Sequence, residues 1–402
     1  MAAKKHSAER VVVTGMGVVS PLAIGVEAFH SSLLGGRTGI VPFTPPWPTG
    51  YKSVRAGLVV GFEAAGVPSC GRASQMALVA SKQALDCAGI GVPVSRPERI
   101  GVVAATALGD APEFETCSDT GVNGNASVDW MRIGSMADRV ARAVGVEGPV
   151  QLVMTTCAAG NHAISWSASL LTAGAADAML AVASDALGYV DLLGFCRLLL
   201  QAPERCQPFD LYRKGTVLAE GAAAVVLETL STAESRGATV LAEILGSGES
   251  CDAAGPFASN LNDMRGMQLA FERAIRAAEI SADEIDHVSA HGSGTKLNDR
   301  KETAFLKTVL GARAYKVPTS AIKSMLGHAQ GAASMFEAIA SILSLQHDCL
   351  YPTINYETPD PFCDLDYVPN CAREHRVRTI MSNAFGVGGN NSIVIFRRWP
   401  SC

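Results

Sequence analysis

Cys157 is the residue of this chain whose local sequence best suits nucleophilic chemistry. Residues 151–155 have the pattern of a short buried strand, and an Ala/Ser/Leu-rich stretch ending at residue 171 predicts a buried helix just after Cys157. At such a strand-to-helix turn, free backbone N–H groups and the helix dipole favour the thiolate form of a cysteine. A cysteine among apolar residues is more often a small core residue. The local pattern therefore leaves a nucleophile and a packing residue as open alternatives.

Two histidines and a lysine in the second half of the chain also lie beside apolar segments. His291 follows a predicted strand over residues 285–290, and Lys323 and His328 come shortly before a predicted helix. A lone histidine is more often a hydrogen-bonded structural residue than a catalyst. In a wound α/β sheet, however, the strand ends converge on the ligand site. We therefore expect these three side chains to lie near Cys157.

Short β-branched runs alternate with longer Ala/Leu-rich helical patterns, which predicts an α/β protein whose sheet is covered on both faces. The predicted strands span residues 10–14, 100–104, 151–155, 178–183, 222–228, 285–290, 378–382 and 392–396. The predicted helices span residues 25–34, 74–88, 131–144, 162–173, 264–278, 299–310 and 331–346. The two halves have a similar order of elements, which indicates duplication.

A polar, glycine-containing segment near the middle of the chain marks the predicted boundary between the halves. Residues 246–250 are predicted as a turn because they read Gly-Ser-Gly-Glu-Ser. The predicted organisation is therefore a loose tail over residues 1–9, an N-terminal half over 10–245 with the nucleophile, and a C-terminal half over 246–402 with the histidines and lysine.

Two glycine-rich segments resemble phosphate-binding loops without having their defining residues. Residues 11–20 resemble the start of a dinucleotide fingerprint, but Ser20 and Pro21 replace its third glycine and no acidic residue follows at the expected distance. We therefore predict a structural strand and turn there. Residues 385–391 lack a Lys-Ser/Thr ending and lead into a strand, so their glycines are expected to let backbone approach a substrate or another loop.

Composition and charge narrow the class of protein. The formal net charge of −5 gives no electrostatic case for nucleic acid or an anionic membrane. No apolar run approaches the roughly 20 residues that span a bilayer, and the polar, basic start lacks the apolar region of a secretory signal. The eleven cysteines form no CxxC pair, which indicates reduced thiols in a cytoplasm, with no disulfide framework and no metal site.

Six short motifs, in order along nearly the whole chain, resemble those of a β-ketoacyl–acyl carrier protein synthase of the elongating type, one of the thiolase-like condensing enzymes. The matching segments are Thr155-Thr156-Cys157-Ala158-Ala159-Gly160, Pro208-Phe209-Asp210 with Arg213, Glu220-Gly221-Ala222-Ala223, Ala290-His291-Gly292 with Thr295, Lys323-Ser324-Met325-Leu326-Gly327-His328, and Ser382-Asn383-Ala384-Phe385-Gly386. The order Cys, His, Lys, His also distinguishes elongating from initiating synthases, which carry an asparagine where His328 stands.

The resemblance implies a five-layer αβαβα sandwich of two related halves, and a catalytic role for four residues. Cys157 would accept an acyl chain from a thioester. The backbone N–H groups of Cys157 and Phe385 would form the oxyanion hole. After a malonyl thioester loses CO₂, His291 and His328 would donate hydrogen bonds to the enolate, as neutral imidazoles. Lys323 would hold His291 and tune the local charge.

The resemblance also implies supporting residues and partners. Glu302 would be the ion-pair partner of Lys323, Ser293 and Thr295 would bind the phosphopantetheine arm, and Phe385 with Gly386 would gate the acyl pocket. The substrates would be carried on acyl carrier protein, so no other cofactor is expected. The protein would form a homodimer, or a heterodimer with a chain-length-factor-like subunit, with a basic docking patch for the acidic carrier protein.

Several positions depart from the family pattern and bear on the substrate. Ser293 and Gly294 stand where Thr and Ser are common, Val387 replaces a phenylalanine, and Asn390 replaces a threonine. These changes favour polyketide or unusual acyl-chain synthesis over housekeeping fatty acid elongation. Three other classes of protein are alternatives. A non-catalytic partner subunit would lack Cys157, and a thiolase would use a second, late cysteine as base. A cysteine hydrolase would need only one histidine.

Overall fold

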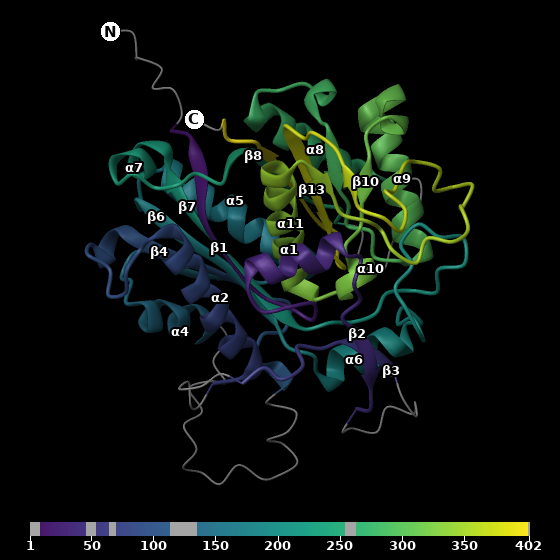
Figure 1. The fold of residues 1–402 in the computed structure, drawn as a ribbon, viewed down its shortest axis with the longest axis horizontal. Coiled ribbons are helices and arrows are strands. Elements are labelled where there is room, and N and C mark those ends of the chain that lie inside the picture. Colours follow the sequence, from purple (N-terminus) through teal and green to yellow (C-terminus); the bar gives the residue numbers. More distant parts are fainter. Residues whose placement is uncertain (1–8, 46–53, 64–69, 113–134, 254–262, 401–402) are drawn as a thin grey trace.

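The computed structural model describes residues 9–45, 54–63, 70–112, 135–253 and 263–400. The predicted tail over residues 1–9 lies outside this part except for its last residue, as do the first four residues of the helix predicted over 131–144. A large sheet runs through the molecule (Figure 1). It has ten strands in the order β10-β9-β13-β14-β8-β1-β7-β6-β4-β5.

This sheet consists of two five-stranded halves with the same topology. The N-terminal half contains β1 (Val11–Val19), β4 (Ile100–Ala105), β5 (Val150–Val153), β6 (Ala178–Asp185) and β7 (Gly221–Thr229). The C-terminal half contains β8 (Ala242–Cys251), β9 (His287–Ser289), β10 (Thr319–Ser320), β13 (Thr379–Phe385) and β14 (Asn390–Arg397). In the N-terminal half, β7 pairs antiparallel with β1 and β6, and β4 pairs parallel with β5 and β6. In the C-terminal half, β14 pairs antiparallel with β8 and β13, and β9 pairs parallel with β10 and β13. The shared pattern confirms the predicted relation between the halves.

The helices form three layers around these half-sheets (Figure 1). Helices α2 (Arg72–Ala88) and α4 (Ser135–Val144) cover the outer face of the N-terminal half, and α8 (Arg265–Ala278) and α9 (Lys296–Leu310) cover that of the C-terminal half. Helices α5 (Ala159–Thr172) and α11 (Ala333–His347) pack between the halves and contact strands of both. Every residue of α11 from Ala333 to Leu345 is buried, as expected of a helix covered on all sides. The predicted five-layer αβαβα sandwich is confirmed.

The smaller elements connect these layers. The remaining helices are α1 (Val26–Leu34), α6 (Tyr189–Arg197), α7 (Leu230–Ser235) and α10 (Lys323–Leu326), and the remaining strands are β2 (Ile40–Phe43), β3 (Val54–Gly57), β11 (Cys349–Leu350) and β12 (Arg373–Glu374). Single turns of 3-10 helix span Pro97–Arg99, Thr156–Ala158, Ala282–Glu284, Gly311–Tyr315 and Gln330–Ala332. None of the described helices is long and apolar enough to span a membrane.

Glycine pairs in the two central strands explain where the predicted turns are wrong. Gly15 and Gly17 lie inside β1, and Gly246 and Gly248 lie inside β8, so neither segment is the turn that its composition predicts. A Cβ atom at Gly17 would overlap the carbonyl oxygen of Ala80 in α2, and one at Gly248 would overlap that of Ala270 in α8. The glycines therefore let a helix pack directly against the strand backbone. The division of the chain near residue 245 stays a prediction, although that position falls within β8.

We expect Gly17→Ala and Gly248→Ala each to destabilise the protein by about 3 kcal/mol, the upper end of the usual cost of overpacking, because backbone cannot move aside as a side chain can. The midpoint of urea unfolding measures this effect. Gly91→Ala is the matched control, since a Cβ there meets nothing within 4 Å, and it should change stability by less than about 0.5 kcal/mol. Equal midpoints for all three variants would contradict the packing role.

Candidate active site

Cys157 lies on a strained turn between β5 and α5. The turn is the 3-10 helix Thr156–Ala158, and Thr156 adopts a left-handed backbone conformation with φ of 51°. Non-glycine residues rarely adopt this conformation, which tends to occur at functional sites. The thiol is buried at 7% exposure, yet it lines the large cavity described below. The predicted strand-to-helix turn is therefore present, with the cysteine facing a cavity.

The glycine-rich segment after β13 packs against this turn. Thr156 Oγ1 donates to the carbonyl oxygen of Val387 at 3.0 Å, and the N–H of Val387 interacts with the Cys157 sulfur. A Cβ atom at Gly386 would overlap Thr156 Oγ1 and lie 3.3 Å from the nitrogen of Cys157. Gly386 is thus the residue that allows the segment to touch the nucleophile turn. This agrees with the expectation that its glycines permit close approach to another loop.

His291 is held through its backbone and through one ring nitrogen. The carboxylate of Glu302 accepts from the backbone N–H groups of His291 and Gly292, both at 2.8 Å. Lys323 Nζ donates to the carbonyl oxygen of His291 at 2.7 Å and lies 3.4 Å from its Nδ1. Because an ammonium can only donate, Nδ1 accepts and the ring proton resides on Nε2.

His328 has the same tautomer for a different reason. The backbone N–H of Gln330 donates to Nδ1 of His328 at 3.1 Å, so this ring also carries its proton on Nε2. Its backbone is fixed by bonds to the segment before β7: His328 N donates to Val217 O at 2.7 Å, and Ala219 N donates to His328 O at 2.9 Å. Both imidazoles therefore have an Nε2–H group available as a donor.

The structure brings Cys157, His291 and His328 together at one cavity. Their ligand atoms, the sulfur and one ring nitrogen of each histidine, all lie within 4.8 Å of one another. The two rings meet edge-on, with centroids 5.5 Å apart. The cavity has a volume of about 660 Å³, and Phe385 also lines it. A sulfur and two imidazoles could also ligate a soft transition-metal ion, so the expected absence of a metal stays a prediction.

Burial dominates the electrostatics of all three groups. Burial raises the pKa of the Cys157 thiol, while the N–H of Val387 and the Lys323 ammonium act in the opposite direction. Burial, then Lys323, lowers the pKa of His291 and of His328 well below the usual range, so both rings are neutral. Backbone N–H groups do favour the thiolate, but the larger contribution comes from Val387 in the segment after β13 and a smaller one from Cys157 in the predicted turn. Burial outweighs both.

The predicted ion pair between Lys323 and Glu302 is wrong, because Lys323 pairs with Glu337. Its Nζ donates to Glu337 Oε1, and both side chains are at most 2% exposed. Glu302 instead binds the two backbone N–H groups of the His291 loop and the side-chain amide of Asn383. Sequence reasoning missed Glu337, although it is the single charged residue in the otherwise apolar and small-residue run of α11 from Ala333 to Leu345.

Ser293 and Thr295 line the same cavity on its way to solvent. Their hydroxyl oxygens lie 3.0 Å apart, and Thr295 Oγ1 also accepts from Asn298 N as the N-cap of α9. Two lysines that also line this cavity, Lys214 and Lys296, are exposed. Because Lys296 follows Thr295 directly, the predicted binding residues for a long substrate arm lie where this part of the cavity reaches solvent.

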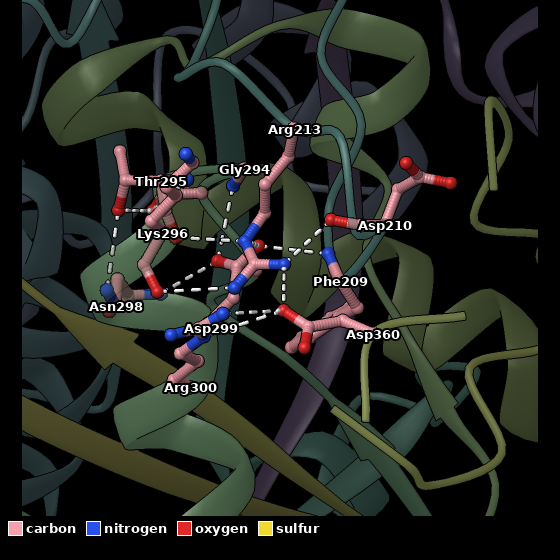
Figure 2. Close-up of polar contacts among 12 residues, drawn as sticks. Phe209, Asp210, Arg213, Gly294, Thr295, Lys296, Asn298, Asp299, Arg300 and Asp360 are labelled. Carbon is pink, nitrogen blue, oxygen red and sulfur yellow. Dashed lines mark hydrogen bonds and ion pairs between the residues drawn. The ribbon is translucent and has the colours of Figure 1, made fainter. Parts of the chain in front are cut away.

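A fully buried arginine fixes this mouth. The guanidinium of Arg213 lies 2.8 Å from Asp360 and 3.4 Å from Asp299, and it also donates to the backbone oxygens of Thr295 and Lys296 (Figure 2). The Asp299 carboxylate accepts in turn from the backbone N–H groups of Phe209 and Gly294. This network joins the segment before β7 to the start of α9 and ties down the Ser293–Thr295 loop at Gly294 and Thr295.

The N–H of Phe385 faces away from β14. In the β13–β14 pair, Gly386 N donates to Asn390 O, and successive N–H groups of a strand point to opposite sides. Strand β9 ends its pairing with β13 at Ser382, before this point. The Phe385 N–H therefore projects from an open edge of β13, as an oxyanion-hole donor requires.

We expect Gly386→Ala to slow acyl transfer to Cys157 by about 100-fold, because the added methyl group overlaps Thr156 Oγ1 and must displace the nucleophile by about 1 Å. Intact-protein mass spectrometry after mixing with an acyl thioester measures the rate. The double variant with Thr156→Ala should recover part of the loss, since it removes the overlapping oxygen. Wild-type loading by the single variant would refute this steric role.

We expect Lys323→Met combined with Glu337→Gln to move alkylation of Cys157 to higher pH. Alkylation requires the thiolate, and removal of the Lys323 charge raises the pKa of Cys157 further, so a rise of one in that pKa slows the reaction at neutral pH about tenfold. The pH profile of iodoacetamide labelling is the measurement. Lys301→Met is the control, because Lys301 lines the same cavity but pairs with Asp252 at 3.4 Å. An unchanged profile would show that Lys323 does not act on the thiol.

The chain matches two family models in succession. Residues 8–233 match the β-ketoacyl synthase N-terminal domain, and residues 241–357 match the β-ketoacyl synthase C-terminal domain. Among curated relatives, the tetracenomycin polyketide synthase ketoacyl synthase alpha subunit of Streptomyces glaucescens is 37% identical, over 98% of both chains.

Two solved structures give the same result. The ishigamide ketosynthase/chain length factor superposes with a TM-score of 0.92 at 34% identity, over 98% of this chain and 100% of the other. The ketosynthase in AntDE:AntF, a type II polyketide synthase (PKS) acyl-carrier protein in complex with its ketosynthase bound to the hexaketide, gives 0.91 at 32% identity over the same shares. The two family models, this extent of similarity and the cysteine–histidine–histidine site lead to one conclusion: the chain belongs to the β-ketoacyl synthase family.

Proposed function

We propose that this protein joins an acyl chain held on Cys157 to a malonyl unit on acyl carrier protein, by decarboxylative Claisen condensation in polyketide or specialised acyl-chain synthesis. The observation that carries the proposal is the meeting of one buried thiol with two neutral Nε2–H imidazoles at a cavity of about 660 Å³. A hydrolase would need a histidine with an unprotonated ring nitrogen free to accept a proton from water. Here Nδ1 of each ring already accepts a hydrogen bond and Nε2 carries the proton, so both rings act as donors.

In the first half-reaction the Cys157 sulfur attacks the carbonyl carbon of an acyl thioester. The bond to the pantetheine sulfur breaks, and the released pantetheine thiol takes up the proton from Cys157. The N–H groups of Cys157 and Phe385 stabilise the negative oxygen of the tetrahedral intermediate. Lys323 favours this step because its charge opposes the effect of burial on the thiol.

In the second half-reaction a malonyl thioester loses CO₂, and the electron pair of the broken C–C bond forms an enolate. The Nε2–H groups of His291 and His328 donate to the enolate oxygen, which stabilises the charge without a proton transfer. The enolate carbon then attacks the Cys157 thioester, and a C–C bond forms as the C–S bond breaks. Cys157 leaves as the thiolate and the acyl chain is two carbons longer.

The supporting residues have roles at the mouth and the gate. Ser293 and Thr295 hydrogen-bond the phosphopantetheine arm, and Phe385 separates the acyl pocket from the malonyl site. Gly386 allows the gate to close on Cys157, and the small, 41% exposed Val387 leaves more space at the gate than a phenylalanine would. Glu302 shapes the His291 loop through backbone bonds.

An edge strand and two exposed apolar side chains support assembly with a second subunit. Strand β5 is the last in the described sheet order, and Met154 and Trp166 beside it are 48% and 46% exposed. An unpaired edge with apolar neighbours is suited to pairing with another chain. The partner is a second copy or a chain-length-factor-like subunit. The substrates arrive on acyl carrier protein, no further cofactor takes part, and the protein acts in the cytoplasm.

We expect an acyl–carrier protein thioester to leave its acyl group on Cys157, and malonyl–carrier protein to discharge it as a β-keto product two carbons longer. Mass spectrometry of the protein and of the carrier detects both species. Cys157→Ala is the control and should form no adduct. Steady release of free acid would indicate a hydrolase, and no adduct on the wild-type protein would indicate a non-catalytic subunit.

A further inference from the structure

The turn that carries His328 also contains a strained residue. Gln330 has φ of 50°, a left-handed conformation that non-glycine residues rarely adopt. This conformation directs the Gln330 N–H to Nδ1 of His328 at 3.1 Å. The hydrogen bond that fixes the His328 tautomer therefore depends on an unfavourable backbone conformation, and something must stabilise it.

The side chain of Gln330 supplies one such restraint through a buried carboxylate. Its Nε2 donates to Asp191 Oδ2, and the two residues are 5% and 6% exposed. The other oxygen of Asp191 accepts from the N–H groups of Gly188 and Leu192 at the start of α6, both at 2.9 Å. Asp191 is thus held rigidly by the helix start and offers one oxygen to Gln330.

The next residue of the turn has a separate anchor. Gly331 N donates at 2.8 Å to Asp185, which also accepts from the backbone of residues 107–109. Asp185 therefore fixes the position of the turn as a whole, whereas Asp191 contacts only the side chain of Gln330. Removal of the Asp191–Gln330 bond should release the Gln330 N–H without releasing the turn.

We propose that Asp191 and Gln330 are positioning residues that keep the His328 proton on Nε2, where it faces the reacting groups. Without the Gln330 N–H, Nδ1 of His328 can carry the proton, and the Nε2 that faces the cavity then becomes an acceptor, which repels an enolate. The inference rests on the proposed function for the donor role of His328. It assigns to this buried pair a task specific to the malonyl half-reaction.

Five variants separate this task from a general effect on folding. Gln330→Leu removes the side-chain bond, and Gln330→Glu places two carboxylates face to face. Asp191→Asn is the conservative change. The double variant Asp191→Asn with Gln330→Glu exchanges amide and carboxylate, so the bond can form again in the opposite direction while the backbone donors of α6 keep an acceptor. The matched control is Gln83→Leu, which removes another glutamine bond, to Val18 N at 2.8 Å, in the outer layer of the N-terminal half.

We expect Gln330→Leu and Gln330→Glu to slow decarboxylation of malonyl–carrier protein by on the order of 10- to 100-fold. Acyl transfer to Cys157 should stay within about twofold of wild type, because His328 donates only in the second half-reaction. The double exchange should restore decarboxylation to within about threefold. Gln83→Leu should leave both rates unchanged.

The tautomer can also be measured without substrate. In protein labelled with ¹⁵N-histidine, the ring resonances of His328, assigned with a His328→Gln variant, should show the Nε2–H form in the wild type and in the double exchange, and a mixture in Gln330→Leu. Equal losses in both half-reactions, an unchanged tautomer, or failure of the exchange to restore decarboxylation would each overturn the inference. A wild-type protein that neither loads Cys157 nor decarboxylates malonyl–carrier protein, but keeps the Nε2–H tautomer, would instead overturn the proposed function alone.

Discussion

The site depends on one buried cation acting on three titratable groups. Burial acts in opposite directions on the two kinds of group in the proposed mechanism. It favours the neutral imidazoles that the proposed second half-reaction needs, and it disfavours the thiolate that the proposed first half-reaction needs. The charge of Lys323 lowers the pKa of Cys157, His291 and His328 alike. It therefore adds to burial in keeping the imidazoles neutral, and it opposes burial by favouring the Cys157 thiolate. A buried lysine is stable only beside a carboxylate, and Glu337 supplies one. Burial raises the pKa of Glu337 to about 7, and Lys323 acts against that rise.

The duplicated fold explains how groups from both halves reach one point. Cys157 follows β5 in the N-terminal half, and His291 and Lys323 follow β9 and β10 in the other. Strand β4 corresponds to β9 and β5 to β10 by their pairings, so equivalent strand ends of the two halves supply the reactive groups. The central helices α5 and α11 lie between the halves. Helix α5 begins just after Cys157, and α11 carries Glu337, the partner of Lys323. One architectural repeat therefore supplies the nucleophile in one copy and the donors in the other.

Sequence reasoning found the residues at strand ends and missed those whose role depends on tertiary contacts. Cys157, His291 and His328 were recognisable because reactive side chains stand next to apolar strand or helix patterns and within matching motifs. The position of Glu302 just after the His291 loop suggests a pair with Lys323, but its carboxylate oxygens accept from backbone N–H groups of that loop. The composition around Gly246 and Gly248 predicts a turn, because glycines that admit a packed helix have the same local sequence context as turn glycines. Tertiary packing decides which carboxylate or helix lies opposite a given residue. The local sequence pattern carries no information about that packing.

Thr156 and Gln330 are two strained residues that are each restrained by a hydrogen bond from their own side chain, a feature that the sequence does not reveal. Thr156 and Gln330 both have left-handed backbone conformations, and each directs a group onto the chemistry: Thr156 sets the turn of the nucleophile, and Gln330 aims an N–H at His328. Each is restrained by a hydrogen bond from its own side chain, Thr156 to the carbonyl of Val387 and Gln330 to Asp191. A polar side chain at a strained position thus offsets part of the cost of the strain and specifies its direction. The two restraints lead to the gate after β13 and to helix α6, and both of these elements line the cavity. A substitution that moves either element is therefore expected to move Cys157 or His328 as well, which couples the shape of this cavity to the position of the thiol and the imidazole.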